Sequence, residues 1–295
     1  MSVAAMEPVP VRAARGGSLR RALRGNPLMA LGLGIAVLFV LIAIFAPLIA
    51  PHPADAGSAT HPTQALLGPS GDHWFGTDQV GRDIFTRVLY GARTSLRIAA
   101  LVLLLSALIG VPLGIAAGYF GGWVDDVIMR VTDVFLAFPA LLLSLELASV
   151  LSPSVGNATL AIAVTWWPWY ARLARGAATQ VAARGYIESA RALGVSPARI
   201  LGRHVLPNAV TPVLVQGSLD VGGIILTAAA LSFLGLGAQD PTPEWGLMVS
   251  QGQGYLNTEW WFPVFPGLAI VLAALAFNLL GDGLRQALDP RSVTR

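Results

Sequence analysis

The segment ESARALGVSPARILGRHVLP, residues 188–207, is a polar and charged stretch that lies between long apolar runs. Residues 186–193 are good helix formers, and Glu188 stands in the first turn, where a negative charge suits the helix dipole. Gly194 follows at the position where a left-handed residue commonly ends a helix. The first half of the segment therefore predicts a short helix that ends at a tight turn.

The second half of the segment contains the signals of another helix. Ser196 can cap its first turn, and Pro197 suits the first helical position because its missing N–H would have no partner there. Pro207 would end this helix. We expect a rigid, charged helical hairpin that is tied to an apolar run on each side. Such a hairpin is a suitable docking site for another protein.

Composition places this hairpin in a membrane protein. The chain has 295 residues, of which 55% are hydrophobic and 12% are charged, and its mean hydropathy is +0.65. A soluble domain is typically about 25% charged. The chain has no cysteine, and all 19 basic residues are arginine. Without lysine there is no phosphate-binding loop with its lysine, so any ATP must be bound by another chain.

Six stretches have the roughly 20 mainly apolar residues that a membrane-spanning helix needs. They are residues 28–50, 97–118, 131–151, 157–175, 208–234 and 264–284. The fourth is the weakest, because four aromatic residues gather at one end of a short apolar run. These aromatics fit either an interfacial belt or buried packing. The fold class is therefore an all-α polytopic membrane protein with six transmembrane helices.

The arginine distribution predicts the orientation of these helices. Of the 19 arginines, 15 fall in the N-terminal tail and in the segments that six spans place on the same side, which predicts cytoplasmic N- and C-termini. The predicted organisation is a cytoplasmic basic tail (1–27), a first transmembrane helix (28–50) and an external loop (51–96). A core of five further spans (97–291) follows and includes the hairpin loop (184–207).

Three segments are expected on the outside, at 51–96, 152–156 and 235–263. Within the first loop, residues 81–97 alternate basic and apolar positions at helical spacing, which predicts an amphipathic helix on the outer membrane surface that leads into the second span. Residues 235–263 form the second long external segment, with several tryptophans and prolines. This segment could contact a soluble partner or pack against the spans, and the sequence leaves both open.

Histidines gather in the first external loop. His52, His61 and His73 share it with Asp55 and Asp72. These are residue types that bind metals, but no tight ligand spacing connects them. We interpret them as solvated loop side chains.

Two acidic residues fall within predicted spans, Glu146 and Asp220. A charge in the middle of a membrane costs about 2.5–3.5 kcal/mol on insertion scales, so such residues usually face a water-filled path or a partner. They could line a translocation path and meet a cationic group of a substrate. They could equally be acids near a span edge, or acids paired with an arginine of another subunit.

The hairpin matches a known pattern, in which Glu-Ala-Ala, three residues, Gly and nine residues precede Ile-x-Leu-Pro. The matching positions are Glu188, Ser189, Ala190, Gly194, His204, Leu206 and Pro207. The pattern resembles the cytoplasmic loop signature of permease subunits of ABC importers. Ser189 replaces the middle alanine. His204 replaces the isoleucine, and Arg-His-x-Leu-Pro-Asn at 203–208 resembles the peptide-transporter branch.

Four further motifs resemble the dipeptide, oligopeptide and nickel permeases, in the same order along the chain. They are residues 73–96, 118–125, 231–246 and 278–291. The resemblance covers residues 28–291. It implies the type I ABC importer permease fold in a bacterial or archaeal cytoplasmic (inner) membrane. It also implies that the loop at 184–207 is a coupling loop, which seats in a groove of an ATPase subunit.

The resemblance implies partners as well. The permease would pair with a second, homologous permease, two cytoplasmic ATPase subunits would hold ATP and Mg²⁺, and an external binding protein would deliver the substrate. Within this chain we expect no catalytic residue, cofactor or metal, and we expect no nucleic-acid partner. Relatives with similar permeases handle peptides, nickel chelates, glutathione and oligosaccharides, so the sequence leaves the substrate open.

Two other classes of function compete with an importer subunit. One is an ion-coupled secondary transporter or channel that uses Glu146 or Asp220. The other is a membrane-anchored scaffold without transport. The prolines and glycines in the predicted spans argue against a scaffold, because they suit helices that surround a translocation path. The hairpin distinguishes an importer subunit from an ion-coupled carrier, because an ion-coupled carrier has no need of a docking element.

Overall fold

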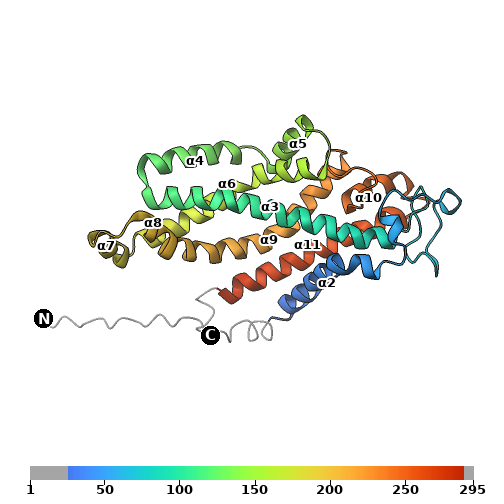
Figure 1. Cartoon of the computed structure of the whole chain (residues 1–295), viewed down its shortest axis with the longest axis horizontal. Coiled ribbons are helices and arrows are strands. Elements are labelled where there is room, and N and C mark those ends of the chain that lie inside the picture. The colour runs from blue at the N-terminus through green and yellow to red at the C-terminus, as the bar shows by residue number, and fades with distance from the viewer. Residues whose placement is uncertain (1–25, 289–295) are drawn as a thin grey trace.

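A computed structural model describes residues 26–288, and these are almost entirely helical (Figure 1). The predicted basic tail (1–27) lies almost wholly outside the described residues. The α-helices are α2 (Pro27–Ile49), α3 (Ile84–Phe120), α4 (Gly122–Leu136), α5 (Ala140–Val150), α6 (Val155–Ala182), α7 (Gly185–Ala192), α8 (Pro197–Ile200), α9 (Leu206–Phe233), α10 (Trp245–Gly252) and α11 (Trp261–Leu288). Residues 28–50, predicted as the first transmembrane helix, lie almost wholly in helix α2, which Asn26 caps by accepting a hydrogen bond from the Met29 N–H.

Four helical stretches are long and apolar enough to cross a membrane. They are α2, α3, α11 and the stretch from Pro197 to Phe233 that includes α9. The bent pair of α4 and α5 would make a fifth span. Helix α6 is 28 residues long but is not among them, and its second half carries Arg172 and Arg175. Length and composition thus support four or five spans in the described residues, and the sixth stays a prediction.

The span predicted at 131–151 is not one continuous helix, because it falls within the bent pair of α4 and α5. Helix α4 ends at Leu136, α5 begins at Ala140, and the two axes meet at 85°. Pro139 lies in the break. A proline disfavours helical backbone in the residue before it and has no N–H to donate to the preceding turn, which accounts for the break.

The separate amphipathic helix predicted at 81–97 is also wrong. Residues from Ile84 onward belong to α3, one continuous helix of 37 residues. Arg82 and Asp83, expected on a polar outer face, are 2% and 0% exposed. Their charges are satisfied inside the protein, so this region is a buried polar junction and not a surface helix.

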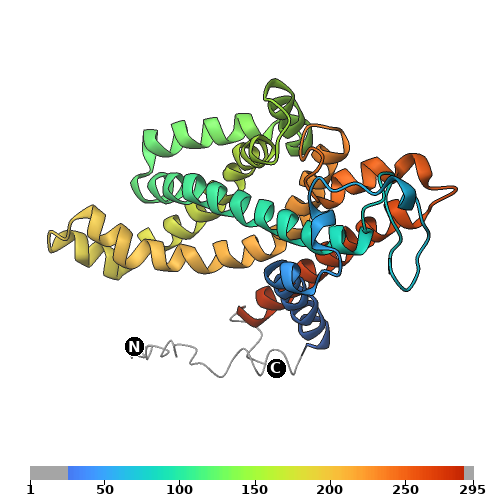
Figure 2. The ribbon, with the colours of Figure 1, turned by 45° about the vertical axis from the view of Figure 1, so that its right-hand side comes forward.

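The arrangement separates two ends of the bundle. The loop at 50–83 and the segment around α10 lie at one end, whereas α7, α8 and the turn between α3 and α4 lie at the other (Figure 1). Figure 2 shows α4 and α2 on opposite sides of the bundle. Of the described segments, the two long loops predicted outside therefore lie at one end, and the hairpin predicted inside lies at the other.

Close contact between α3 and α6 forms the centre of the bundle. Gly110, Gly114 and Gly118 recur every four residues along α3 and face α6. A Cβ added at Gly114 would lie 2.1 Å from the carbonyl oxygen of Ala171, and one at Gly110 would lie 2.4 Å from that of Trp167. Small residues at this spacing let two helix backbones approach closely, as they commonly do in membranes.

Ion pairs attach α4 to α6. The Arg175 guanidinium donates two hydrogen bonds to Asp125, from Nε and Nη2, each 2.5 Å long. Arg172 Nη2 donates to Asp133 Oδ1, also at 2.5 Å. Bidentate pairs of this kind fix orientation as well as distance. They hold α4 along α6 although few apolar side chains of α4 are buried.

Buried charges close the loop end of the bundle. Arg82 pairs with Asp78 through Nε at 2.7 Å and with Asp240 through Nη2 at 2.8 Å. Burial alone would raise the pKa of Asp240, but its hydrogen bond to Arg82 and the charge of that residue hold the pKa below its ordinary value. The pair links the first loop to the segment between α9 and α10.

The segment predicted as the second long external loop packs against the spans around α10. Trp245 is fully buried, and its Nε1–H donates to the Val88 carbonyl of α3 at 3.0 Å. Glu244 caps α10 by accepting the N–H groups of Gly246 and Leu247 at 3.0 and 2.9 Å. Burial raises the pKa of the Glu244 carboxyl. The sequence left open whether this segment contacts a soluble partner or packs against the spans. Around α10 it packs against the spans.

Candidate functional site

The hairpin between α6 and α9 begins with α7, which ends at Ala192, and Gly194 forms the predicted turn two residues later. The φ angle of Gly194 is +77°, in the left-handed region. The Gly194 N–H donates to the Arg191 carbonyl and the Val195 N–H donates to the Ala190 carbonyl, both at 3.0 Å. This pair of bonds is a Schellman motif, which satisfies carbonyls that the end of the helix leaves free. The turn is therefore fixed by backbone bonding.

Three apolar side chains anchor the hairpin to the bundle. Ile187 of α7, Ile200 of α8 and Val205 are each 0% exposed. They join an apolar cluster to which α3, α6 and α9 contribute, including Val111, Ile115, Ala174, Ala178, Val181 and Ala209. Burying one such side chain contributes about 1.5–3 kcal/mol. The hairpin is thus a packed extension of the bundle and moves with it.

The second helix of the hairpin does not stop before Pro207, contrary to the sequence prediction. It continues from α8 through a π-helical turn at Leu201–Val205 directly into α9. The Leu206 N–H donates to the Leu201 carbonyl, five residues back. Pro207 occupies the first turn of α9, where its missing N–H costs little once the preceding turn has widened. Ser196 makes no side-chain capping bond.

The outer surface of the hairpin carries most of the signature residues. Glu188 and Ser189 are exposed, and Ser189 Oγ donates to the Gly185 carbonyl at 3.1 Å. His204 is half-buried, with its ring 5.7 Å from that of Tyr186. Leu206 is 41% exposed, and Pro207 beside it is exposed. The signature thus forms an accessible surface at one end of the bundle.

Leu193 is a residue of this surface that the sequence reasoning missed. Its side chain is 84% exposed at the tip of the hairpin, next to Gly194. Nearby, the guanidinium of Arg191 lies 4.6 Å from the ring centre of Tyr119 on α3. A large apolar residue directly before the Gly194 turn, where the chain is expected to be exposed, is the signal that could have identified Leu193. Its exposure suits burial against a partner.

The structure does not bring Glu146 and Asp220 together. Asp220 of α9 accepts hydrogen bonds from Tyr170 Oη at 2.7 Å and from Gln216 Nε2 at 2.9 Å. Glu146 lies exposed on α5. Neither acid has an arginine within ion-pair distance among the described residues. The bond from Tyr170 therefore joins α6 to Asp220 of α9 within this chain.

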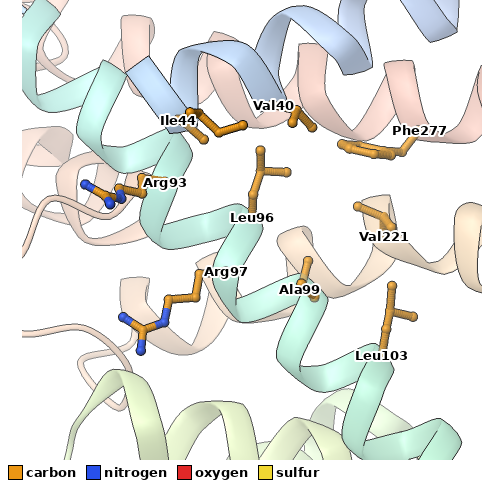
Figure 3. Close-up of a pocket in the computed structure, with 11 residues that line it drawn as sticks. Val40, Ile44, Arg93, Leu96, Arg97, Ala99, Leu103, Val221 and Phe277 are labelled. Atoms are coloured by element: carbon orange, nitrogen blue, oxygen red, sulfur yellow. The ribbon is translucent and has the colours of Figure 1, made fainter. Parts of the chain in front are cut away.

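A cavity of about 540 Å³ opens between α2, α3, α9 and α11 (Figure 3). Its lining is apolar, with Val40 from α2, Leu103 from α3 and Phe277 from α11. Arg93 and Arg97 of α3 stand at one end of it. Neither Glu146 nor Asp220 lines it. Such a lining suits hydrocarbon more than a zwitterionic peptide, because burying unpaired charges is costly.

The positive φ at Gly194 leads to a prediction for the substitution Gly194→Val. A β-branched residue resists a left-handed conformation, at a cost of about 1–3 kcal/mol. We expect the hairpin to be distorted and substrate uptake to fall, while the amount of inserted protein is preserved. Hydrogen exchange over residues 185–205, measured together with uptake, checks this. Gly202→Val is the matched control, because Gly202 lies in the same hairpin without a positive φ. Equal uptake by wild type and Gly194→Val would contradict the prediction.

Several apolar helices long enough to cross a membrane, with a stiff, exposed hairpin at one end, indicate a multi-pass membrane protein. Residues 110–294 match the family described as binding-protein-dependent transport system inner membrane component, and residues 17–69 match the N-terminal TM domain of oligopeptide transport permease C. The chain belongs to this family of inner-membrane permease components, which work with a binding protein. It is a transport subunit and not an enzyme.

Several curated relatives of the chain are permeases named for small peptides. It is 46% identical over 269 residues to the dipeptide transport system permease protein DppC of Alkalihalophilus pseudofirmus, covering 91% of this chain and 88% of the relative. It is 46% identical over 277 residues to the probable D,D-dipeptide transport system permease protein DdpC of Escherichia coli, covering 94% and 92%. The glutathione transport system permease protein GsiD of Pectobacterium atrosepticum is 44% identical over 272 residues, covering 92% and 89%.

A solved structure shares the fold. The inward-facing MetNI methionine ABC transporter matches with a TM-score of 0.56 and 20% identity, over 72% of this chain and 98% of the matched chain. The predicted ABC importer permease fold and the resemblance to the peptide permease branch are thereby confirmed.

Proposed function

We propose that this chain is one of two permease subunits of an ATP-driven importer that moves short peptides across the inner membrane by alternating access. The observation that carries the proposal is the continuity of the hairpin with α9, from Pro197 to Phe233. A force applied to the hairpin is transmitted to a helix that spans the bundle. The exposed side chains of Glu188 and Leu193 supply a surface on which an ATPase can exert that force.

The division of labour among subunits follows from the chemistry of the chain. With no lysine, this chain lacks a phosphate-binding loop, so ATP and Mg²⁺ reside on two separate ATPase subunits. ATP-driven closure of those subunits moves the hairpins, and rigid-body motion of the two permeases opens the central path to alternate sides. A binding protein delivers the substrate to the end formed by the first loop and the α10 segment.

The substrate class rests on the relatives, whose names include dipeptides, D,D-dipeptides and glutathione. These molecules are short, zwitterionic peptides or peptide derivatives. We place this chain with the same class. Nickel complexes, carried by another branch of similar permeases, are the competing cargo that an uptake panel must include.

The first experiment is mass spectrometry of what co-purifies with the chain from native membranes in mild detergent. We expect two kinds of partner, namely ATPase subunits and a second permease of the same family. Uptake of labelled dipeptides by the purified assembly in liposomes, with ATP and binding protein, then tests the direction and the cargo. Recovery of the chain alone in several detergents would overturn the proposal.

Energy coupling separates this proposal from an ion-driven carrier. We expect uptake by the ATP-supplied complex to continue when proton and sodium gradients are collapsed. Asp220→Asn should reduce uptake by no more than about fivefold, because it weakens one hydrogen bond, worth about 1 kcal/mol, between α9 and its neighbours. Glu146→Gln should have no larger effect. Loss of uptake on collapsing the gradients, with ATP present, would favour the carrier.

A further inference from the structure

The fold assembles a cluster of metal-binding side chains in the first external loop that the linear spacing did not predict. His52, His73 and Asp83 each place a ligand nitrogen or oxygen within 4.8 Å of the others. His52 follows α2, His73 lies in the middle of the loop, and Asp83 caps the start of α3. Of the loop histidines that we interpreted as solvated, His73 is only 7% exposed.

The contacts within the cluster resemble those around a metal ion. His73 Nδ1 and Asp83 Oδ1 form a direct hydrogen bond at 3.0 Å, a separation that is also close to that of two ligands sharing one zinc ion at about 2.0–2.2 Å. The rings of His52 and His73 are 4.9 Å apart between centres. His52 Nε2 lies 3.1 Å from the Asp72 carbonyl, an outer contact that leaves Nδ1 available. A movement of about 1–2 Å would bring all three groups onto one ion.

Charge also favours a cation here. Asp83 is fully buried, and its described side-chain contacts are with His73 and with the Thr86 N–H. No arginine lies within ion-pair distance of its carboxylate in the described residues. Burying a carboxylate without an arginine partner is costly, and a cation bound beside Asp83 would offset that cost.

The cluster is accessible from outside the bundle. His52 and His73 line an open cavity of about 610 Å³, together with Asp55, His61 and Asp72. An ion can therefore reach the cluster without unfolding of the loop. His61 has its own partner in this cavity, Asp55, at 2.9 Å, and so stands apart from the group of three.

We propose that His52, His73 and Asp83 form a binding site for a divalent transition metal, Zn²⁺ foremost. Two imidazoles and one carboxylate are a ligand set that zinc accepts, with a further position for water or for a group on a partner. The ion would join the end of α2, the loop and the first turn of α3. It would thereby hold in place the face on which a binding protein docks in the function proposed above.

The test uses the full-length chain in lipid nanodiscs, with an affinity tag that contains no histidine. Zn²⁺ is titrated by equilibrium dialysis with metal analysis, and Co²⁺ absorption reports the ligand set. We expect one saturable Zn²⁺ per chain. Loss of one ligand, in His52→Ala or His73→Ala, should weaken binding by at least about 100-fold, because even outer-shell changes cost 10–100-fold.

Controls come from the other two histidines of the chain. His204→Ala, in the hairpin at the opposite end, should bind Zn²⁺ as the wild type does. Zn²⁺ should raise the unfolding temperature of the wild type and of His204→Ala, but not of His52→Ala, whose side chain is only partly buried and whose loss the fold should tolerate. Mg²⁺ should have no such effect.

Two results would overturn the site. One is the absence of saturable Zn²⁺ binding to the wild type. The other is binding that survives in His52→Ala but disappears in His61→Ala, which would assign the metal to the neighbouring pair. Neither result would contradict the proposed transport function, because that function is tested separately by co-purification and uptake.

Discussion

Glu188→Arg is expected to abolish substrate uptake while the protein still inserts and folds. Glu188 is exposed on α7 and contributes nothing to the apolar cluster that anchors the hairpin, so its replacement should change stability by no more than about 0.5 kcal/mol. Against an ATPase groove, reversal of a docked charge costs about 2–5 kcal/mol, which is roughly 30-fold to several-thousand-fold weaker seating. Co-purified ATPase and uptake should fall together.

A graded series distinguishes lost docking from a general defect. Glu188→Asp keeps the charge and should retain most uptake, whereas Glu188→Gln should fall between Asp and Arg. The second permease should stay bound in all three variants, because in this proposal Glu188 contacts the ATPase and not the other permease. Full transport by Glu188→Arg would show that the hairpin is not the coupling element.

Gly114→Leu is expected to prevent assembly of the folded bundle. A Cβ at this position already lies 2.1 Å from a backbone oxygen of α6, and no side-chain rearrangement can move a backbone atom away. Overpacking usually costs about 1–3 kcal/mol, and a clash with backbone should exceed that range because α3 and α6 must separate. The expected result is little folded protein in gel filtration and a large loss of thermal stability in detergent.

The matched control for this substitution is Gly176→Leu on α6. A Cβ at Gly176 meets nothing within 4 Å, so the same change in residue type should leave the isolated chain folded. If both variants folded equally well, the close approach of α3 and α6 would not determine stability. If both failed, the leucine itself and not its position would be responsible.

The parts of the fold that local residue types determine could be predicted. The hairpin turn at Gly194 depends on bonds between residues only a few positions apart, and α2 follows from an uninterrupted apolar run. The site residues Glu188 and Ser189 lie on the surface where their signature suggests. Pro139, by contrast, was visible in the sequence and should have counted against a single span at 131–151.

Other features depend on residues far apart in the chain and have no local signal. Arg82 looked like a surface charge, because its partner Asp240 lies 158 positions away. The cluster of His52, His73 and Asp83 forms because the loop brings His52 beside His73. The spacing of these residues along the sequence does not predict that contact. Pro207 looked like a helix end, because the π-helical turn that accommodates it depends on residues 201–205 being packed against α6 and α3.

The length of the continuous helical stretch from Pro197 to Phe233 also determines how far one of its ends moves when the other end is tilted. At about 1.5 Å per residue its 37 residues extend about 55 Å, nearly twice the thickness of the hydrocarbon core. If this stretch tilts by about 10° about one end, the other end moves by about 10 Å, from its length alone. A small rotation of the ATPases could therefore open a gate wide enough for a peptide, without any relay of side chains between the two sites.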